Sequence, residues 1–87
     1  MAYRIELRPA AQKAIESLDK QGFHRIRKAI DNLSLDPRPK GCVKLSGIEA
    51  WRIRVGSFRI LYMISDKDLI VLILKIGNRK DIYRSLR

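Results

Sequence analysis

The pattern of apolar and polar positions predicts a hairpin in the second half of the chain. Residues 51–55 and 58–62 alternate apolar side chains with basic or other side chains around a Gly-Ser pair. Such alternation is typical of strands with one buried face, and a glycine followed by another residue favours a two-residue turn. In the register that this turn sets, Arg54 lies opposite Arg59, and the neighbouring apolar residues face each other in the same way.

The predicted hairpin has one apolar face and one basic face. The apolar face carries Trp51, Ile53, Val55, Phe58, Ile60 and Tyr62. The opposite side, here named the arginine face, carries Arg52, Arg54 and Arg59. Two arginines opposite each other on adjacent strands repel, so this arrangement costs stability. We therefore expect the arginine face to hold a polyanion.

The remaining apolar patterns predict two helices and further strands. Residues 3–7 alternate as a short strand, and residues 10–18 carry apolar side chains at helical spacing. Gly22 is the expected end of that helix, and a second helix follows over residues 23–33. The apolar run at 69–74 is too short for a typical helix and predicts a central strand buried on both faces.

The order of these elements predicts an α+β fold in one domain spanning residues 1–87. An N-terminal strand is followed by a two-helix hairpin and then by a three-strand antiparallel meander. A further short strand can begin at residues 43–45. We expect the helices to pack on one face of a single sheet, against Trp51, Ile53 and Ile60. The arginine face is then the more open, concave side.

The charge of the chain indicates an anionic partner. The 87 residues include nineteen Lys and Arg against nine Asp and Glu, for a net charge of +10. A domain this basic implies a nucleic acid or an acidic protein partner, whereas a solvated surface with excess lysine is the simpler alternative. The last 37 residues use arginine much more than lysine, and arginine is suited to bidentate phosphate contacts.

Composition also bears on location. No apolar run approaches the roughly 20 residues needed to span a bilayer, so no membrane association is expected. The single cysteine, Cys42, cannot form an internal disulfide, which fits a reducing cytoplasm.

The chain lacks most residues that enzymes use for catalysis, but a metal-free ribonuclease remains possible. There is one histidine, His24, and neither the cysteine nor the scattered carboxylates have metal-site spacing, so no metal or other cofactor is expected. RNA carries its own nucleophile, the 2′-hydroxyl, and fixed cations can stabilise the charge that develops on the phosphorane. The candidate catalytic residues are Arg52, Arg54, Arg59, Arg79 and Tyr83.

Two of these candidates also have simpler explanations. Tyr83 could stack on a base or hold a hydroxyl, but it could equally be an aromatic side chain packed at the sheet edge. Arg79 could be a solvated loop charge.

Three segments make the chain resemble the RelE/ParE toxin superfamily, and its RelE branch in particular. They are residues 51–62, the apolar strand at 69–74 and the sequence Ile-Gly-Asn-Arg-Lys-Asp-Ile-Tyr-Arg at 76–84. The resemblance implies the toxin of a type II toxin–antitoxin system. Such a toxin enters the ribosomal A site, cleaves the mRNA there by 2′-hydroxyl attack and inhibits translation. The family's catalytic positions fall on Arg52, Arg54, Arg59, Arg79 and Tyr83.

The same resemblance implies a set of partners. The substrate is mRNA on the 70S ribosome, and a cognate antitoxin with an acidic, amphipathic segment wraps the basic surface. Operator DNA is bound only through the complex with the antitoxin.

One departure from the family pattern concerns the general base. The best-characterised pattern has lysines where this chain has Arg52 and Arg54. A lysine can lose its proton, whereas an arginine, with a pKa above about 12, effectively cannot. The reaction therefore uses another base, such as Tyr83, or depends on positioning and charge alone.

Two other functions stay open at this point. A ParE-like toxin has the same fold but inhibits DNA gyrase by binding it, without ribonuclease activity. A non-catalytic basic adaptor would bind nucleic acid or an acidic partner with a steep salt dependence. The Arg79–Tyr83 pair favours the ribonuclease.

Overall fold

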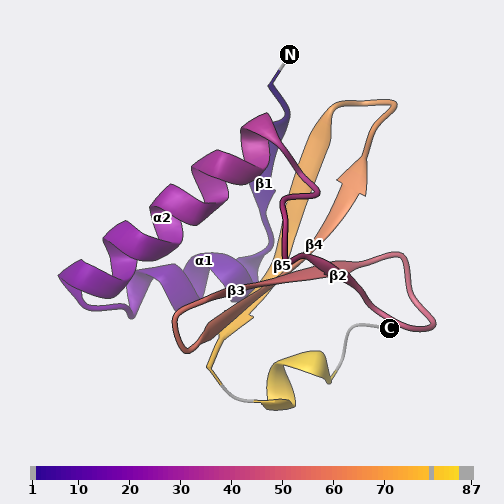
Figure 1. Ribbon diagram of the computed structural model, residues 1–87. Helices are drawn as coiled ribbons and strands as arrows, with labels where there is room; N and C mark the ends of the chain where they lie inside the picture. Colours follow the sequence, from indigo (N-terminus) through magenta and orange to yellow (C-terminus); the bar gives the residue numbers. More distant parts are fainter. Residues whose placement is uncertain (1, 79, 85–87) are drawn as a thin grey trace.

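A computed structural model describes residues 2–78 and 80–84, which form a sheet covered by two helices on one face (Figure 1). The elements in chain order are β1 (Arg4–Leu7), α1 (Pro9–Glu16), α2 (Lys20–Leu35), β2 (Val43–Lys44), β3 (Trp51–Val55), β4 (Phe58–Ser65), β5 (Ile70–Gly77) and the 3₁₀ helix η1 (Lys80–Tyr83). The predicted α+β order of strand, two helices and meander is confirmed. In the described part of the chain, no helix is long and apolar enough to cross a membrane.

The sheet contains five strands in the order β1-β5-β4-β3-β2. The meander of β3, β4 and β5 is antiparallel, as predicted, and the short β2 extends it at one edge. The N-terminal β1 pairs in parallel with β5. The predicted central strand is confirmed with shifted bounds, because β5 begins at Ile70, continues to Gly77 and lies between β1 and β4.

The hairpin has the predicted register. Val55 lies opposite Phe58 and Arg54 opposite Arg59. Gly56 has a φ of +61°. It occupies the first central position of the two-residue turn, where a type II′ turn favours glycine. This turn sets which side chains share a face along both strands.

Both helices cover the apolar face, and their buried side chains form the main core with the sheet. Ala11 of α1 and Leu33 of α2 are fully buried, as are Ile60 and Ile73 of the sheet. Trp51 is partly buried against this core. The predicted packing of the helices on one face of the sheet is therefore confirmed.

The boundary between the helices differs from the prediction, because Gly22 does not end the first helix. Helix α1 ends at Glu16, and Gly22 lies in the first turn of α2. The Asp19 carboxylate accepts a hydrogen bond of 2.7 Å from the Gly22 N–H and caps α2. An aspartate that satisfies a free N–H starts a helix, and here this local bond outweighs the tendency of glycine to stop one.

The arginine face is less open than the sequence predicts. Ala50, Leu61 and Leu74 are buried there, with Ile82 and Tyr83 packed on them, and we name this group the second core. After β5, η1 brings the chain back over this face. Because η1 covers Ala50 and Leu61, which precede β5 in the chain, alternation within the strands could not reveal the second core.

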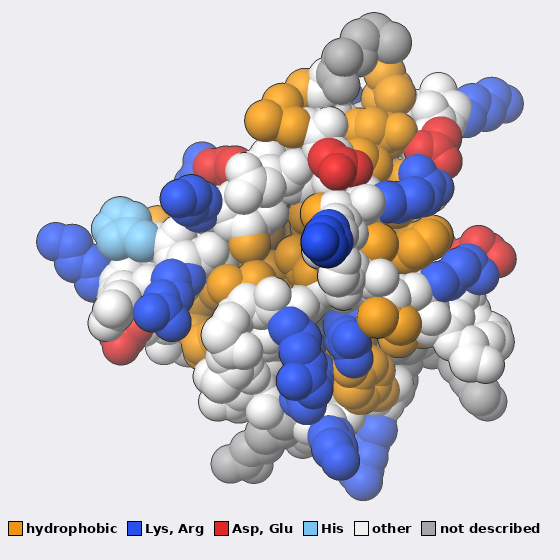
Figure 2. Space-filling model, viewed as in Figure 1, with side chains coloured by type: hydrophobic (Ala, Val, Ile, Leu, Met, Phe, Trp, Pro, Cys, Tyr) orange, Lys and Arg blue, Asp and Glu red, His pale blue; other side chains and the backbone are white. Residues whose placement is uncertain are grey.

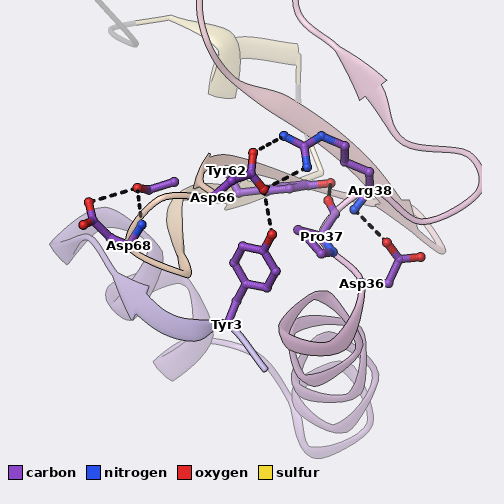
Figure 3. Close-up of polar contacts among 8 residues, drawn as sticks. Tyr3, Asp36, Pro37, Arg38, Tyr62, Asp66 and Asp68 are labelled. Carbon is purple, nitrogen blue, oxygen red and sulfur yellow. Dashed lines mark hydrogen bonds and ion pairs between the residues drawn. The ribbon is translucent and has the colours of Figure 1, made fainter. Parts of the chain in front are cut away.

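A polar network fastens three connections at one end of the sheet (Figure 3). The Arg38 guanidinium donates two hydrogen bonds to the Asp66 carboxylate, at 3.1 and 2.8 Å, and the Tyr3 hydroxyl donates a third at 2.6 Å. Arg38 also lies over the Trp51 ring, 5.2 Å from its centroid. The network thereby joins residues before β1, between α2 and β2 and between β4 and β5.

A second contact lies at the same end of the sheet. The buried Tyr62 hydroxyl donates a hydrogen bond of 2.7 Å to the Pro37 carbonyl, and burial raises the pKa of this phenol.

The Asp66 contacts predict a specific loss of stability in acid. The hydrogen bonds from Arg38 and then Tyr3 lower the pKa of Asp66 from 3.8 to about 2. The pKa of Asp66 is lower in the folded state than in the unfolded state. The stabilisation of the folded state is therefore present above pH 3.8 and is lost as the pH falls toward about 2. Urea denaturation over this pH range should show a steeper decline for the wild type than for Asp66→Asn. Parallel curves would contradict the prediction.

Candidate functional site

Strands β3 and β4 bring three of the predicted site residues together on the arginine face. Arg52 lies opposite the buried Leu61, and Arg54 lies opposite Arg59. Arg52 and Arg59 are half-buried, whereas Arg54 is exposed. The three guanidinium groups therefore border one patch of the sheet, as the alternation predicts.

Two donors in this patch have an unusual environment. The Nε atoms of Arg52 and Arg59 are buried, and no hydrogen-bond partner for them lies among the described residues. A buried donor without a partner costs about 1–3 kcal/mol. Both side chains are half-buried, so their charges are less screened by water than those of exposed arginines.

The segment after β5 adds Tyr83 to this surface. Its half-buried ring packs on the second core, which contains Leu61, the cross-strand neighbour of Arg52. The Arg59 Nη1 group donates to the Asn78 carbonyl at 3.5 Å. A packed aromatic ring is one of the two alternatives that the sequence left open for Tyr83, and the structure shows this packing on the second core. A role of Tyr83 in catalysis stays a prediction. The predicted Arg79 lies outside the described residues.

The surface around this group is basic. In Figure 2, Lys and Arg side chains gather in the lower middle of the view, over β3 and toward η1, without an acidic side chain among them. His24 is exposed on α2. Within residues 2–78 and 80–84, no cluster of three or more His, Cys, Asp or Glu side chains could hold a metal ion.

A comparison with protein families identifies the chain. The model that describes the ParE toxin of the type II toxin–antitoxin system parDE matches residues 5–83. The chain belongs to this toxin family. It is a type II toxin of the RelE/ParE superfamily, as the sequence motifs predict.

Individual relatives of this toxin are RelE proteins. A chain in the crystal structure of the archaeal RelE–RelB complex from Pyrococcus horikoshii is 31% identical, with 92% of this toxin and 98% of that chain covered and a TM-score of 0.81. RelE1 of Methanocaldococcus jannaschii, named as a candidate toxin, is 28% identical over 89 residues, which cover 98% of this toxin and 99% of the relative. A chain of the intact Escherichia coli RelBE complex, 22% identical, shares the fold with a TM-score of 0.79 and coverages of 91% and 99%.

The structure adds one residue that sequence reasoning missed in this toxin. Lys75 of β5 lies opposite Leu61, so that Arg52, Leu61 and Lys75 form a row across three strands. The Lys75 ammonium donates to the Arg84 carbonyl at 2.5 Å, which fastens the segment that carries Tyr83. The sequence does carry a signal for this residue, because Lys75 is the one charge in an otherwise apolar strand.

Proposed function

We propose that this toxin cleaves mRNA in the ribosomal A site by attack of the RNA's own 2′-hydroxyl and thereby stops translation. The observation that carries the proposal is the group of Arg52, Arg54 and Arg59 beside Tyr83 on the arginine face. Cleavage of this kind requires an aligned hydroxyl, stabilisation of the phosphorane and a proton for the leaving oxygen. Fixed cations supply the second requirement without a metal ion, and such stabilisation is commonly the largest contribution to the rate.

Each residue has a distinct role in this mechanism. The half-buried Arg52 and Arg59 stabilise the charge on the reacting phosphate, because their partly desolvated guanidinium groups are less screened by water than an exposed cation. The exposed Arg54, together with Arg79, binds the RNA backbone. Tyr83 stacks on a base or holds a hydroxyl, and it is the one of the five with a proton to exchange. In our proposal its phenolic oxygen accepts the proton of the 2′-hydroxyl as the O2′–P bond forms, and its own proton passes to the leaving 5′ oxygen as the P–O5′ bond breaks. The alternative is that positioning and charge alone suffice.

The proposed function also implies a set of partners. The Pyrococcus horikoshii relative was crystallised in complex with RelB. We propose a cognate acidic antitoxin that covers the basic surface of this chain and supplies the operator-DNA binding of the complex. Because the substrate is mRNA on the 70S ribosome, the toxin acts in the cytoplasm.

A cell-free translation reaction with a defined mRNA tests this function. Primer extension should reveal new 5′ ends within the A-site codon when the toxin and ribosomes are both present. Tyr83→Phe should lower their yield by about 10²-fold, the lower range for general acid–base catalysis. Arg79→Ala should also lower it, whereas Arg27→Ala, on the exposed surface of α2, should cleave as the wild type does. Intact mRNA and normal protein output would contradict the proposal.

A second candidate function is inhibition of DNA gyrase, which the match to the ParE model favours. A supercoiling assay with purified gyrase distinguishes the two candidates. Under our proposal, gyrase keeps its activity at toxin concentrations that arrest translation. Loss of supercoiling with intact mRNA would instead identify a gyrase inhibitor, and binding of RNA without either effect would identify a basic adaptor.

A further inference from the structure

A hollow of about 300 Å³ lies at the edge of β3, on the side of the sheet that α2 covers. Ala29 and Asn32 of α2 form one wall, the turn at residues 39–41 forms another, and residues 53–55 of β3 form the floor. Neither an acidic nor an aromatic side chain is among these lining residues. The hollow lies apart from the second core and from Tyr83.

The edge of β3 is open here because β2 is short. β2 pairs with Trp51 and Arg52 alone, and continuation of this register would place Gly41 opposite Arg54. The chain instead turns away, with a Cys42 N–H to Pro39 carbonyl hydrogen bond of 3.0 Å and a φ of +93° at Gly41. Residues 53–55 are therefore left without a strand on this side.

The main chain of Arg54 faces the open edge. The Leu45 N–H donates to the Ala50 carbonyl at 2.9 Å, so the Ala50 carbonyl points away from β4. Main-chain directions alternate along a strand, and the N–H and C=O groups of Arg52 and Arg54 point the same way. On this outer side of β3, Arg52 pairs with Val43 of β2, whereas no described strand pairs with Arg54. Such an unpaired donor and acceptor form a template for an added strand.

The two sides of the edge determine which side chains an added strand would carry. A residue opposite Arg54 projects toward the arginine face, beside a guanidinium group, where a carboxylate would form an ion pair. The residues before and after it project into the hollow, against the apolar Ala29, Ile53 and Val55. Lys40 adds a positive charge to the lining of the hollow. The matching order is apolar, acidic, apolar.

We propose that the edge of β3 binds an extended apolar–acidic–apolar segment of an acidic protein partner as an added antiparallel strand. This inference rests on the proposed antitoxin partnership and specifies which strand of the toxin receives the partner. A peptide fits better than RNA, because the unpaired N–H donor and C=O acceptor of Arg54 match the acceptor and donor of a peptide main chain. The lining also offers no aromatic ring on which a base could stack.

Titration of ¹⁵N-labelled toxin with a blocked peptide of alternating valine and glutamate tests the proposal by NMR. We expect the Arg54 amide and its two neighbours to shift, and a valine–lysine peptide to have no such effect. Arg54→Pro removes the free N–H without taking one from the β3–β4 pair, and it should weaken binding at least about tenfold. Leu7→Pro is the matched control, because its N–H faces the open edge of β1.

A second variant, at a different residue, tests the same edge if Arg54→Pro does not fold. Ala29→Phe fills the hollow from α2 and leaves the main-chain N–H and C=O groups of β3 unchanged, and it should cause a comparable loss of peptide binding. Absence of shifts at millimolar peptide, or loss of binding in Leu7→Pro alone, would overturn the inference. Shifts of the same amides by single-stranded RNA in place of the peptide would also overturn it. Failure of mRNA cleavage with intact peptide binding would count against the proposed function alone.

Discussion

Replacement of Arg52 by alanine is expected to slow ribosome-dependent mRNA cleavage by about 10²–10³-fold, the typical cost of removing one donor to a developing oxyanion. Arg52 projects from β3 opposite the buried Leu61, and its Nε atom is itself buried. A charge in this setting is less screened by water than one on an exposed side chain. The cleavage rate on programmed ribosomes, measured with toxin in excess, checks this prediction.

Two further variants separate the charge of Arg52 from its shape. Arg52→Lys keeps the positive charge but loses the planar, bidentate fork, so it should retain more activity than Arg52→Ala. Arg27→Ala removes a cation from the exposed face of α2 and should leave the rate unchanged. Equal rates for the wild type and Arg52→Ala would remove this residue from the reaction.

Gly77→Ala is expected to displace η1 and lower cleavage by about tenfold or more, through loss of the geometry around Tyr83. A Cβ atom at residue 77 would overlap with the Cγ2 atom of Ile82. Ile82 and Tyr83 both pack on the second core, so a shift of one side chain moves the other. The overlap should also lower the free energy of unfolding by about 1–3 kcal/mol, the usual cost of overpacking. Urea denaturation and the cleavage assay measure the two effects.

A double-mutant cycle with Ile82→Ala isolates the cause. This second change removes the Cγ2 atom, so Gly77→Ala should cost less in its presence than in the wild type. We expect a coupling energy of about 0.5–3 kcal/mol between the two positions. Strict additivity would show that Gly77 does not act through Ile82.

Much of the architecture could be predicted because its causes are local. The two-residue turn and the alternation around it determine which residues face each other, and so Arg54 was correctly placed opposite Arg59. The same alternation correctly placed Arg52 with them on one face. The apolar spacing of the two helices likewise revealed which of their sides is buried. The Gly22 prediction failed because one capping bond from Asp19 outweighed the propensity of glycine.

The parallel pairing of β1 with β5 could not be predicted in the same way. The two strands are separated by both helices and the rest of the sheet, so their contact depends on how these elements pack. The candidate site likewise depends in part on pairing between strands that the local pattern does not reveal. The arginines are neighbours through a hairpin, but Lys75 joins them through the pairing of β4 with β5.

By itself, the sequence determined the hairpin, its arginine face, the helical layer and the toxin superfamily, because these depend on short-range periodicity and on motifs within single segments. Only the tertiary structure decided that the arginine face is partly covered, that Tyr83 packs beside it and that β3 keeps an open edge. The physical reason is that each of these features depends on which segments, distant in sequence, pack on a given apolar surface or pair with a given main-chain group. These contacts form only when the whole chain packs.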